Sequence, residues 1–247
     1  MIAKQKNGLK WYENELLSQL GVKHGFFTSL GGESPAPFDS LNVKFDIDDL
    51  DENVDSNRQK ILSVLEIEKV QFAPLVHGAD IAVVTSNSSE IIDNADSLIT
   101  KQKNLAIALS VADCLPIVVS DGKIVAVIHA GWRGTVKQIV SKTVEKMVSL
   151  GFKPENAVAA LGPCICQKHF EVRDEAARLL RAASSEVDIS SEPYYADLVA
   201  INRQQLEDAG VRAVESLSIC SFESDEFYSY RADNGKTGRN MAIALLS

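Results

Sequence analysis

The chain has 247 residues, 45% of them hydrophobic and 24% charged, which is typical of a globular protein with a sizeable core. Its net charge of −9 argues against a broad binding surface for nucleic acid or anionic membranes, although a few arginines could still hold a small anion. The N-terminal residues lack the apolar region of a signal peptide, no apolar run has transmembrane length, and the four cysteines are too few for a disulfide framework. We therefore expect a cytoplasmic protein with reduced thiols, and nothing in the sequence requires more than a monomer.

The first 65 residues combine short strands, a loop and a helix. Residues 24–28 are predicted to be a strand, and a loop rich in glycine and proline follows from Leu30 to Phe38. Asp51 to Leu65 is predicted to be a helix, because Asp51 is a suitable N-cap and apolar residues recur on one face. Arg58 lies on a different face of this helix, so we expect its charge to be solvated.

A histidine stands between two predicted strands in the next segment. The apolar residues from Val70 to Val76 lead to His77, and a second strand is expected over residues 81–85. A histidine at a strand end often has only a structural role, but this setting could also present its imidazole into a cleft. Residues 87–94 are expected to form a loop, and residues 95–100 another short strand.

The segment from Leu105 to Thr135 carries the clearest pattern in the chain. Its two apolar runs are joined by Asp121-Gly122, a pair typical of tight β-hairpins. If these two residues form the loop, Cys114 lies directly opposite His129. Opposed side chains in antiparallel strands have Cβ atoms about 4.5–5.5 Å apart, so this register predicts a thiol beside an imidazole.

A helix is predicted after the hairpin, from Thr135 to about Leu150, because apolar residues recur at helical spacing and Gly151 suits its C-terminal end. Arg133 stands at the junction of strand and helix, beside the free N–H groups of the helix N-terminus. Such turns also occur for packing alone, but an arginine at a helix N-terminus favours an anion site.

The C-terminal part alternates strands and helices. Cys164 and Cys166 follow a predicted strand, and their C-x-C spacing is a weak metal signal that two buried thiols explain better. A single domain covering residues 1–247 is the simplest organisation, since no repeat or linker interrupts the chain. The remaining expected elements are strands at 158–161 and 214–219, helices at 171–182 and 197–209, and a final hairpin that turns at Asn234-Gly235 and returns along Met241–Leu245.

His77, Cys114 and His129 together form a plausible metal site. Two imidazoles and a thiolate suit zinc, and three protein ligands leave a fourth position for a water molecule, as in catalytic zinc sites. The same set occurs in blue-copper sites, but four histidines cannot supply both such a site and a trinuclear copper cluster, so zinc is favoured over copper. Without a metal, His129 could activate Cys114 as a nucleophile.

Five motifs together resemble a known family. They are VHGAD, SVADCLPIVVSDG, HAGWRGT, LGPCI and SYRADNGKTGRNMA. They are similar to those of the YfiH-type family, also called the polyphenol oxidase or laccase-domain family and, in some bacteria, the peptidoglycan editing factor. The resemblance covers essentially the whole chain and implies an α/β (α+β) fold, a single compact domain in which mixed sheets pack with helices. It extends to the catalytic domain of a deamidating bacterial toxin.

The resemblance implies a zinc-dependent purine nucleoside enzyme. Its activities would be phosphorolysis of adenosine, inosine and methylthioadenosine, and deamination of adenosine to inosine. Carried over by motif, the zinc ligands would be His77, Cys114 and His129, with Arg133 beside them at the phosphate or substrate site. The sequence departs from the usual family pattern at Leu75, Ser221 and Ala232, where the family commonly has Gln, Thr and Arg.

Several further residues receive expected roles in this reading. The purine must leave as a protonated or hydrogen-bonded base, a task for Asp80, Asp113 or a zinc-bound water. The residues expected to bind phosphate or substrate are Arg133, Arg231, Arg239, Asn42 and Asp80, and those expected in catalysis are Cys114, His129, Asp113 and Arg133.

Three other functions remain open from the sequence. The first is a cysteine amidase or hydrolase, with Cys114 as nucleophile and His129 as base, which could act on a peptidoglycan precursor. The second is a copper-dependent polyphenol oxidase. In the third, a metal staples a binding module that has no catalytic activity.

Overall fold

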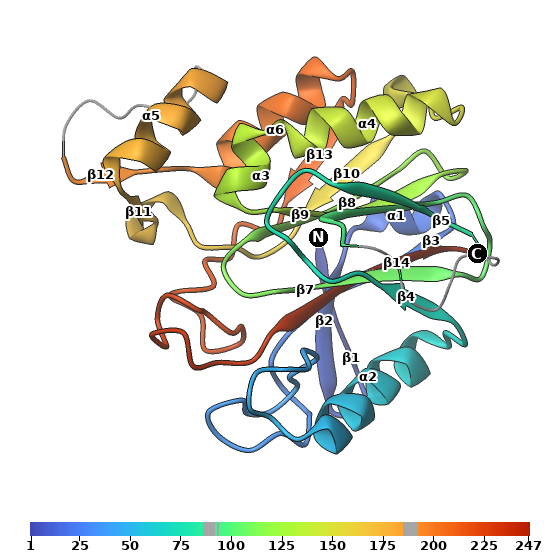
Figure 1. Cartoon of the computed structure of the whole chain (residues 1–247). Coiled ribbons are helices and arrows are strands. Elements are labelled where there is room, and N and C mark those ends of the chain that lie inside the picture. The colour runs from blue at the N-terminus through green and yellow to red at the C-terminus, as the bar shows by residue number, and fades with distance from the viewer. Residues whose placement is uncertain (86–91, 93, 185–191) are drawn as a thin grey trace.

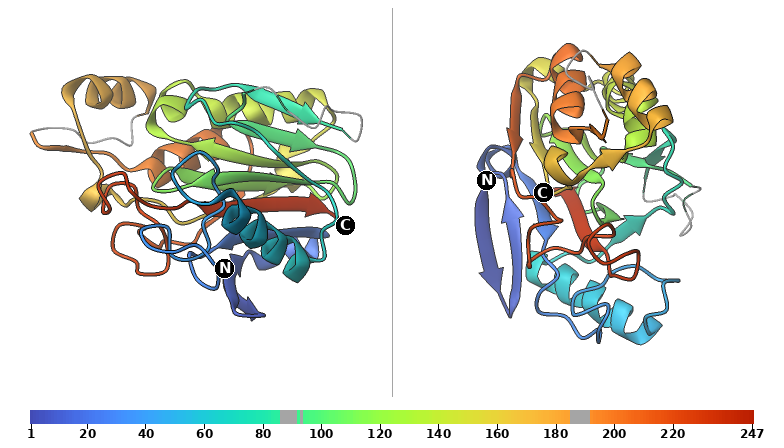
Figure 2. Two further views of the ribbon diagram at one scale, coloured as in Figure 1. Left: turned by 60° about the horizontal axis from the view of Figure 1, so that its bottom comes forward. Right: turned by 90° about the vertical axis from the view of Figure 1, so that its left-hand side faces the viewer.

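Two β-sheets packed face to face form the centre of the molecule, and helices cover their outer faces (Figure 1). The structure is a computed structural model that describes residues 1–85, 92, 94–184 and 192–247. The right-hand view of Figure 2 shows the layers edge-on. The helices that cover the second sheet lie at the top, and one long helix that covers the first sheet lies at the bottom. This arrangement is the expected single compact domain of mixed sheets and helices.

The first sheet has six strands, and the pair at one edge is parallel whereas the other pairs are antiparallel. Its order is β1 (Ile2–Lys6), β2 (Leu9–Glu13), β3 (Val22–Phe27), β14 (Asn240–Leu246), β7 (Ala106–Val111) and β4 (Val70–Phe72).

The second sheet also has six strands and is parallel only at its two edges. Its order is β13 (Ala213–Ser216), β10 (Val158–Leu161), β8 (Leu115–Ser120), β9 (Val125–Ala130), β6 (Ser97–Thr100) and β5 (Ile81–Val84). A separate two-stranded sheet pairs β11 (Glu171–Val172) with β12 (Tyr194–Tyr195).

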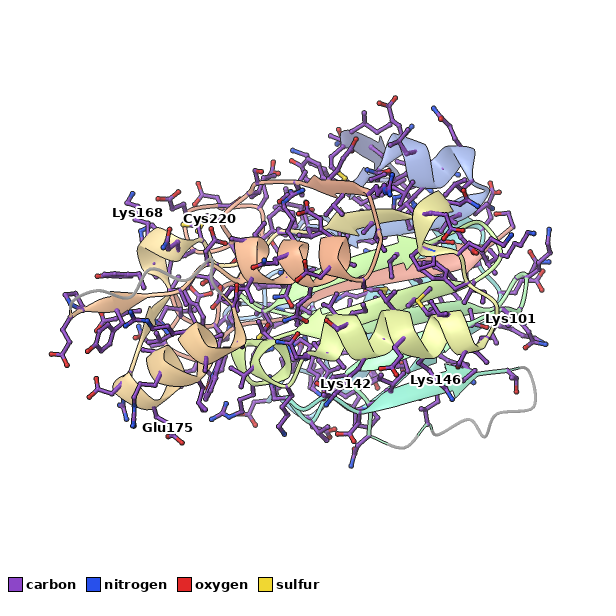
Figure 3. All side chains as sticks on the ribbon, turned by 90° about the horizontal axis from the view of Figure 1, so that it is seen from above. Lys101, Lys142, Lys146, Lys168, Glu175 and Cys220 are labelled. Carbon is purple, nitrogen blue, oxygen red and sulfur yellow. The ribbon has the colours of Figure 1, made fainter. Side chains whose placement is uncertain are left out.

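The helices α4 (Ile139–Ser149) and α6 (Leu198–Asp208) pack on the second sheet, whereas α5 (Asp174–Ala183) lies beyond its end against α3 (Trp132–Val136) (Figure 1). In Figure 3, α4 lies over the second sheet, and Lys142 and Lys146 project from its exposed side. None of the described helices is long and apolar enough to span a membrane. The helical elements are α1 (Glu15–Gln19), α2 (Asp51–Leu65), α3 (Trp132–Val136), α4 (Ile139–Ser149), α5 (Asp174–Ala183), α6 (Leu198–Asp208), and the 3-10 turns η1 (Pro154–Asn156) and η2 (Gln167–His169).

Alternation of side chains along the strands explains the three apolar layers. Val118 and Val127 point towards the first sheet, whereas their neighbours Ile117 and Ile128 point towards α4 and α6. The third apolar layer lies between the outer face of the first sheet and α2, which contributes Ile61 to it. Because the central strands are buried on both faces, they are apolar at nearly every position.

The β8–β9 hairpin forms, but its register differs from the prediction by two residues. Pro116, not Cys114, lies opposite His129. The Asp121 carboxylate accepts hydrogen bonds from the backbone N–H groups of Lys123 and Ile124, so the turn takes up four residues instead of two. A shift by an even number of residues keeps each side chain on its face, so the thiol and the imidazole still meet.

Other predicted elements were partly wrong. The expected helix from Thr135 to Leu150 is broken into α3 and α4 at Gln138, which has a left-handed φ of 61°. No terminal hairpin forms among the described residues, because β14 pairs with β3 and β7 and not with the segment before it. The loop expected at residues 87–94 lies mostly outside the described residues.

Arg58 is not solvated as predicted. Its guanidinium lies between the rings of Phe45 and Phe72, 4.3 and 4.0 Å from their centroids, and its Nε donates to the carbonyl oxygen of Val43. Burial lowers the pKa of this group to about 10. The prediction failed because helical periodicity identifies the face that packs on the sheet, whereas the loop before α2 covers a second face.

Candidate active site

Three side chains from separate segments meet at one end of the two sheets. His77 lies in the loop between β4 and β5, Cys114 in the loop between β7 and β8, and His129 near the end of β9. One nitrogen or sulfur atom of each lies within 4.8 Å of the corresponding atoms of the other two. The two imidazole rings stand nearly perpendicular at 79°, with their centroids 4.8 Å apart. The structure therefore brings together the three residues predicted as metal ligands.

A buried carboxylate, Asp96, orients this trio. It accepts a hydrogen bond from His129 Nδ1 at 2.9 Å and two more from the backbone N–H groups of His77 and Gly78, at 2.9 and 2.6 Å. Asp96 has no solvent exposure. Because His129 Nδ1 is engaged, Nε2 remains as the atom that can face a metal, the arrangement found behind many metal-binding histidines.

The backbone at the site adopts conformations that are rare for residues with a side chain. His77 and Asp113 have positive φ angles of 54° and 76°. Next to His129, Gly131 leaves space for the thiol, since a Cβ atom there would lie only 3.0 Å from Cys114 Sγ. His77 and Cys114 lie in loops outside the regular strands, and these local features hold them in place.

When no cation is bound, Cys114 and His129 shift each other's pKa in opposite directions. Burial raises the pKa of the Cys114 thiol, but the charge of His129 and hydrogen bonds from both imidazoles outweigh it and lower the pKa to about 6. Burial lowers the pKa of His129, whereas the Cys114 thiolate and Asp96 raise it to about 9. A thiolate and an imidazolium therefore coexist at neutral pH, and a metal cation can take the place of the proton.

Metal-free protein should reveal this thiolate by its reactivity. We expect iodoacetamide to alkylate Cys114 at a rate that rises to a plateau with a midpoint near pH 6, as the lowered pKa requires. Mass spectrometry of the alkylated peptide measures the rate. Cys164 provides an internal control, because burial raises the pKa of its thiol well above the usual range. A Cys114 rate that rises only near the ordinary thiol pKa, about 8.5, would contradict this arrangement.

A cavity of about 550 Å³ opens over the trio. This is the size expected for a small-molecule site. Its wall combines the three candidate ligands with cationic and aromatic side chains. The lining residues are Lys44, Leu75, His77, Ser110, Val111, Ala112, Asp113, Cys114, His129, Trp132, Arg133, Ile165, Phe170, Tyr230, Arg231 and Arg239.

The three arginines predicted to bind phosphate or substrate all line this cavity, but they differ in the contacts that hold their side chains. Arg133 is exposed, with its guanidinium 4.4 Å from the Trp132 ring centroid. Arg231 donates to the carbonyl oxygens of His169 and Glu171. Arg239 is held more firmly, since one guanidinium nitrogen donates to two backbone carbonyl oxygens at 2.8 Å. Together they make the wall strongly cationic, which suits an anionic ligand.

Asp113 lines the cavity, but Asn42 and Asp80 do not. Asn42 is fully buried, and its side-chain oxygen accepts a hydrogen bond from the backbone N–H of Arg239, so it positions that arginine from behind. The Asp80 side chain is exposed and its carboxylate lies near Gly78, while its backbone carbonyl oxygen accepts hydrogen bonds from the N–H groups of Asp96 and Ser97. The structure thus gives no direct cavity contact to two of the expected substrate-binding residues.

The Asp113 carboxylate accepts from the Ser221 hydroxyl at 2.6 Å and from the backbone N–H of Arg231 at 2.7 Å. Asp113 therefore joins the segment from Ser221 to Arg231 to the wall of the cavity. The Ser221 hydroxyl supplies one of these two hydrogen bonds.

Sequence reasoning missed several residues of the site. The sequence pattern places Asp96 only in a short strand, although a carboxylate next to a buried apolar strand indicates a buried polar contact. Lys44 and the aromatic residues Trp132, Phe170 and Tyr230 also line the cavity. No spacing pattern connects these four, because they come from segments that only the fold brings together.

The donor set fits zinc. Two imidazoles and one thiolate converge, the second nitrogen of His129 is held by a carboxylate, and the open cavity leaves room for a fourth ligand. A multicopper cluster does not fit, because the chain has four histidines and His24 and His169 lie elsewhere.

Replacing Asp96 by asparagine should weaken metal binding. We expect the dissociation constant for zinc to rise about 10- to 100-fold, because the amide cannot accept all three hydrogen bonds that orient His129 and the His77 loop. Competition with a chelating dye measures this constant. Asp80→Asn serves as the matched control, since among the described residues no hydrogen bond joins the Asp80 side chain to a proposed ligand, and its zinc affinity should stay within about threefold. Unchanged affinity in Asp96→Asn would show that Asp96 has no such role.

The chain is similar to known proteins over almost its whole length. A family model described as multi-copper polyphenol oxidoreductase laccase matches residues 23–247. A Deinococcus radiodurans protein named purine nucleoside phosphorylase is 39% identical over 230 residues, covering 91% of this chain and 89% of the relative. Purine nucleoside phosphorylase YlmD of Bacillus subtilis is 33% identical over 241 residues, covering 89% and 86%.

Solved structures agree with these sequence matches. Bacillus licheniformis YfiH has a TM-score of 0.91 and 30% identity, with 99% of both chains covered. YlmD from Geobacillus stearothermophilus has a TM-score of 0.90 at 30% identity, with 99% of this chain and 98% of that chain covered. Fold, site and sequence therefore agree that the chain belongs to the YfiH-type family, also called the laccase-domain family, whose model is described as multi-copper polyphenol oxidoreductase laccase.

Proposed function

We propose that this protein is a zinc-dependent purine nucleoside phosphorylase that also deaminates adenosine to inosine. The observation that carries the proposal is one cavity in which a His₂Cys trio lies beside three arginines. Its relatives carry the name purine nucleoside phosphorylase, which supports the same class of reaction. The proposed nucleosides are adenosine, inosine and methylthioadenosine, with inorganic phosphate as the second substrate.

Phosphorolysis requires three things of the cavity. Phosphate must be held near the ribose, its oxygen must attack the anomeric carbon as the bond to the purine breaks, and the purine must receive a proton. Arg133, Arg231 and Arg239 offer the charge for phosphate. The rings of Trp132 and Tyr230 offer surfaces on which a purine can stack. His77, Cys114 and His129 would hold the zinc ion, which supplies Lewis acidity when bound.

Asp113 is the one carboxyl group among the described residues that line the cavity. Its two oxygens already accept hydrogen bonds from Ser221 and Arg231, so we assign it to holding these groups and to hydrogen-bonding the departing purine. Deamination in the same cavity would add water to the purine C6 and release ammonia. The same cavity would bind the purine for both reactions.

The test is base release by purified protein with and without phosphate. We expect adenine from adenosine and methylthioadenosine, and hypoxanthine from inosine, only when phosphate is present. Inosine formed from adenosine without phosphate would report deamination. Release of neither base nor inosine from this nucleoside panel would overturn the proposal.

A cysteine hydrolase is the second candidate, and the low pKa of Cys114 beside His129 favours it. Such an enzyme, for example an amidase acting on peptidoglycan precursors, would work without metal. Activity on an amide substrate in chelator-treated protein, lost in proportion to alkylation of Cys114, would establish it. Copper-dependent phenol oxidation is the remaining alternative, and one zinc and no copper at the His77–Cys114–His129 site in the active protein would exclude it.

A further inference from the structure

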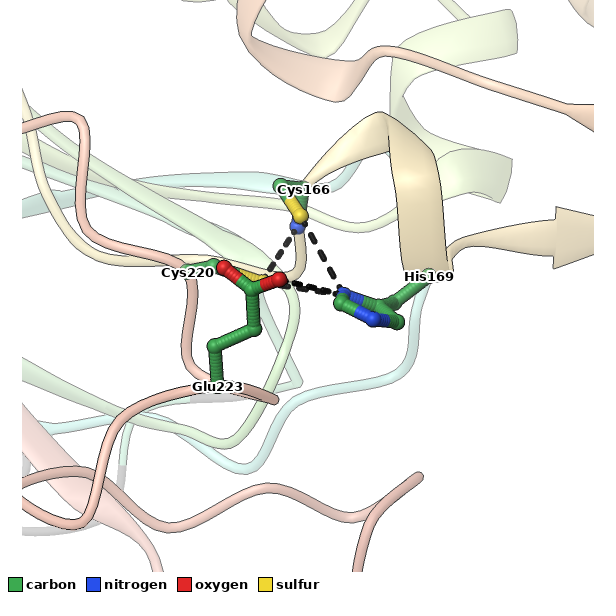
Figure 4. A group of neighbouring side chains, drawn as sticks. All are labelled: Cys166, His169, Cys220 and Glu223. Atoms are coloured by element: carbon green, nitrogen blue, oxygen red, sulfur yellow. Dashed lines mark hydrogen bonds and ion pairs between the residues drawn. The ribbon is translucent and has the colours of Figure 1, made fainter.

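A second group of potential metal ligands lies outside the candidate active site (Figure 4). It consists of Cys166, His169, Cys220 and Glu223, each with one ligand atom within 4.8 Å of the corresponding atoms of the others. The group lies at one end of the molecule, where Figure 3 labels Cys220 together with Lys168.

Two short turns deliver these four side chains. In the turn η2, the backbone N–H of His169 donates to the carbonyl oxygen of Cys166 at 3.0 Å. In the second turn, the N–H of Glu223 donates to the carbonyl oxygen of Cys220 at 3.3 Å. Residues three apart in such a turn point to the same side. The chain thus presents a C-x-x-H pair and a C-x-x-E pair towards each other, each with the two-residue separation also found in the C-x-x-C pairs of zinc sites.

Backbone pairing aligns the two turns. Cys164 and Cys220 form an isolated parallel bridge, in which the N–H of Ser221 donates to the carbonyl oxygen of Cys164 at 3.0 Å. The N–H of Cys166 points at Cys220 Sγ from 3.2 Å. An N–H group that faces sulfur stabilises a thiolate, which is the form that binds metal.

The distances match a tetrahedral zinc site. Zinc bonds of about 2.3 Å to sulfur and about 2.0–2.2 Å to nitrogen or oxygen place neighbouring ligand atoms of a tetrahedron about 3.4–3.8 Å apart. His169 Nδ1 lies 3.4 Å from Cys166 Sγ, 3.8 Å from Cys220 Sγ and 3.6 Å from Glu223 Oε1 (Figure 4). The His169 ring is fixed by stacking on Phe222, with centroids 4.3 Å apart.

Charge around the group also suits a divalent cation. Two thiolates and the Glu223 carboxylate carry three negative charges, which zinc and the ammonium of Lys168, 2.9 Å from Glu223, would balance. Each cysteine would lose its proton to solvent as its zinc–sulfur bond forms, and no electron is transferred.

We propose that Cys166, His169, Cys220 and Glu223 form a second, structural zinc site. With four protein ligands the site is closed, unlike the three-ligand site in the cavity. It would join the loop after β10 to the loop after β13. The neighbours of these loops line the cavity: Phe170 follows His169, and Arg231 donates to the His169 carbonyl oxygen. The second ion would therefore stiffen the cavity wall.

Zinc titration of metal-free, reduced protein tests this proposal. We expect two zinc ions per chain in the wild type, measured by elemental analysis after dialysis. Cys114→Ala should retain one ion, held by the second site, and Cys114→Ala combined with Cys220→Ser should retain none. Cys164→Ala is the matched control, because this neighbouring cysteine is not among the four ligands, and it should still bind two.

Cobalt provides a readout that does not depend on activity. In Cys114→Ala, added Co²⁺ should give a thiolate-to-cobalt absorption band and intense tetrahedral visible bands, and both should vanish with Cys220→Ser. Absence of zinc and cobalt binding in Cys114→Ala would overturn the proposal even if the double variant fails to fold. A Cys166–Cys220 disulfide in protein kept under reductant, or retention of the second ion in the double variant, would equally overturn it.

Discussion

Replacing Cys114 by alanine should reduce kcat/KM for phosphorolysis by at least about 1,000-fold, which corresponds to about 4 kcal/mol. The thiolate is the only anionic ligand of the trio, so its loss removes most of the attraction for zinc. The melting temperature of the metal-free variant should fall by no more than about 4 °C, because the change removes one partly buried side chain and its pairing with His129 but touches none of the three apolar clusters. Steady-state assays with inosine and phosphate, together with thermal unfolding of the metal-free proteins, measure the two effects.

The matched control is Cys164→Ala, which removes a buried thiol outside the cavity wall and should keep activity within a few-fold of wild type. If Cys114→Ala retains substantial turnover, the trio is not catalytic. If the loss of activity in Cys114→Ala is fully explained by the fraction of protein that has unfolded, the metal would only stabilise the fold and the protein would be a binding module.

Replacing Arg133 by methionine should raise KM for phosphate about 10- to 100-fold and leave KM for the nucleoside nearly unchanged. A hydrogen bond to a charged partner contributes about 1.5–3 kcal/mol, which gives this range. The effect should be selective because Arg133 is exposed at the cavity and contacts the Trp132 ring, on which methionine can still pack. Initial rates with each substrate varied in turn measure the two constants.

Arg178→Met is the corresponding control, since Arg178 is an exposed arginine of α5 that does not line the cavity. Its two KM values should match those of the wild type. Equal increases of both constants in Arg133→Met would indicate general damage to the cavity, and an unchanged phosphate constant would assign phosphate to Arg231 or Arg239 instead.

The meeting of Cys114 and His129 could be predicted from the sequence because it depends on local rules. An Asp-Gly pair between two apolar runs predicts a hairpin, and alternation along the strands fixes which side chains share a face. The exact register could not be predicted, since it depends on how the Asp121 carboxylate binds the turn. The prediction survived this error because a two-residue shift preserves the face.

Residues that act through tertiary contacts could not be found in this way. Asp96 reaches His129 and the His77 loop only because β6 pairs with β9. Arg58 becomes buried because a loop covers its helix face. Cys166, His169, Cys220 and Glu223 could not be predicted to form one group, because the C-x-x-H and C-x-x-E pairs lie in distant segments that only the fold brings together.

Formation of ribose 1-phosphate from inosine by metal-stripped protein is the most direct test of the proposed activity. We expect no product without added metal. Added zinc should restore ribose 1-phosphate and hypoxanthine in equal amounts, and only in the presence of phosphate. Restoration by copper but not zinc, base release that is independent of phosphate, or no product after zinc is bound would contradict a zinc-dependent phosphorylase.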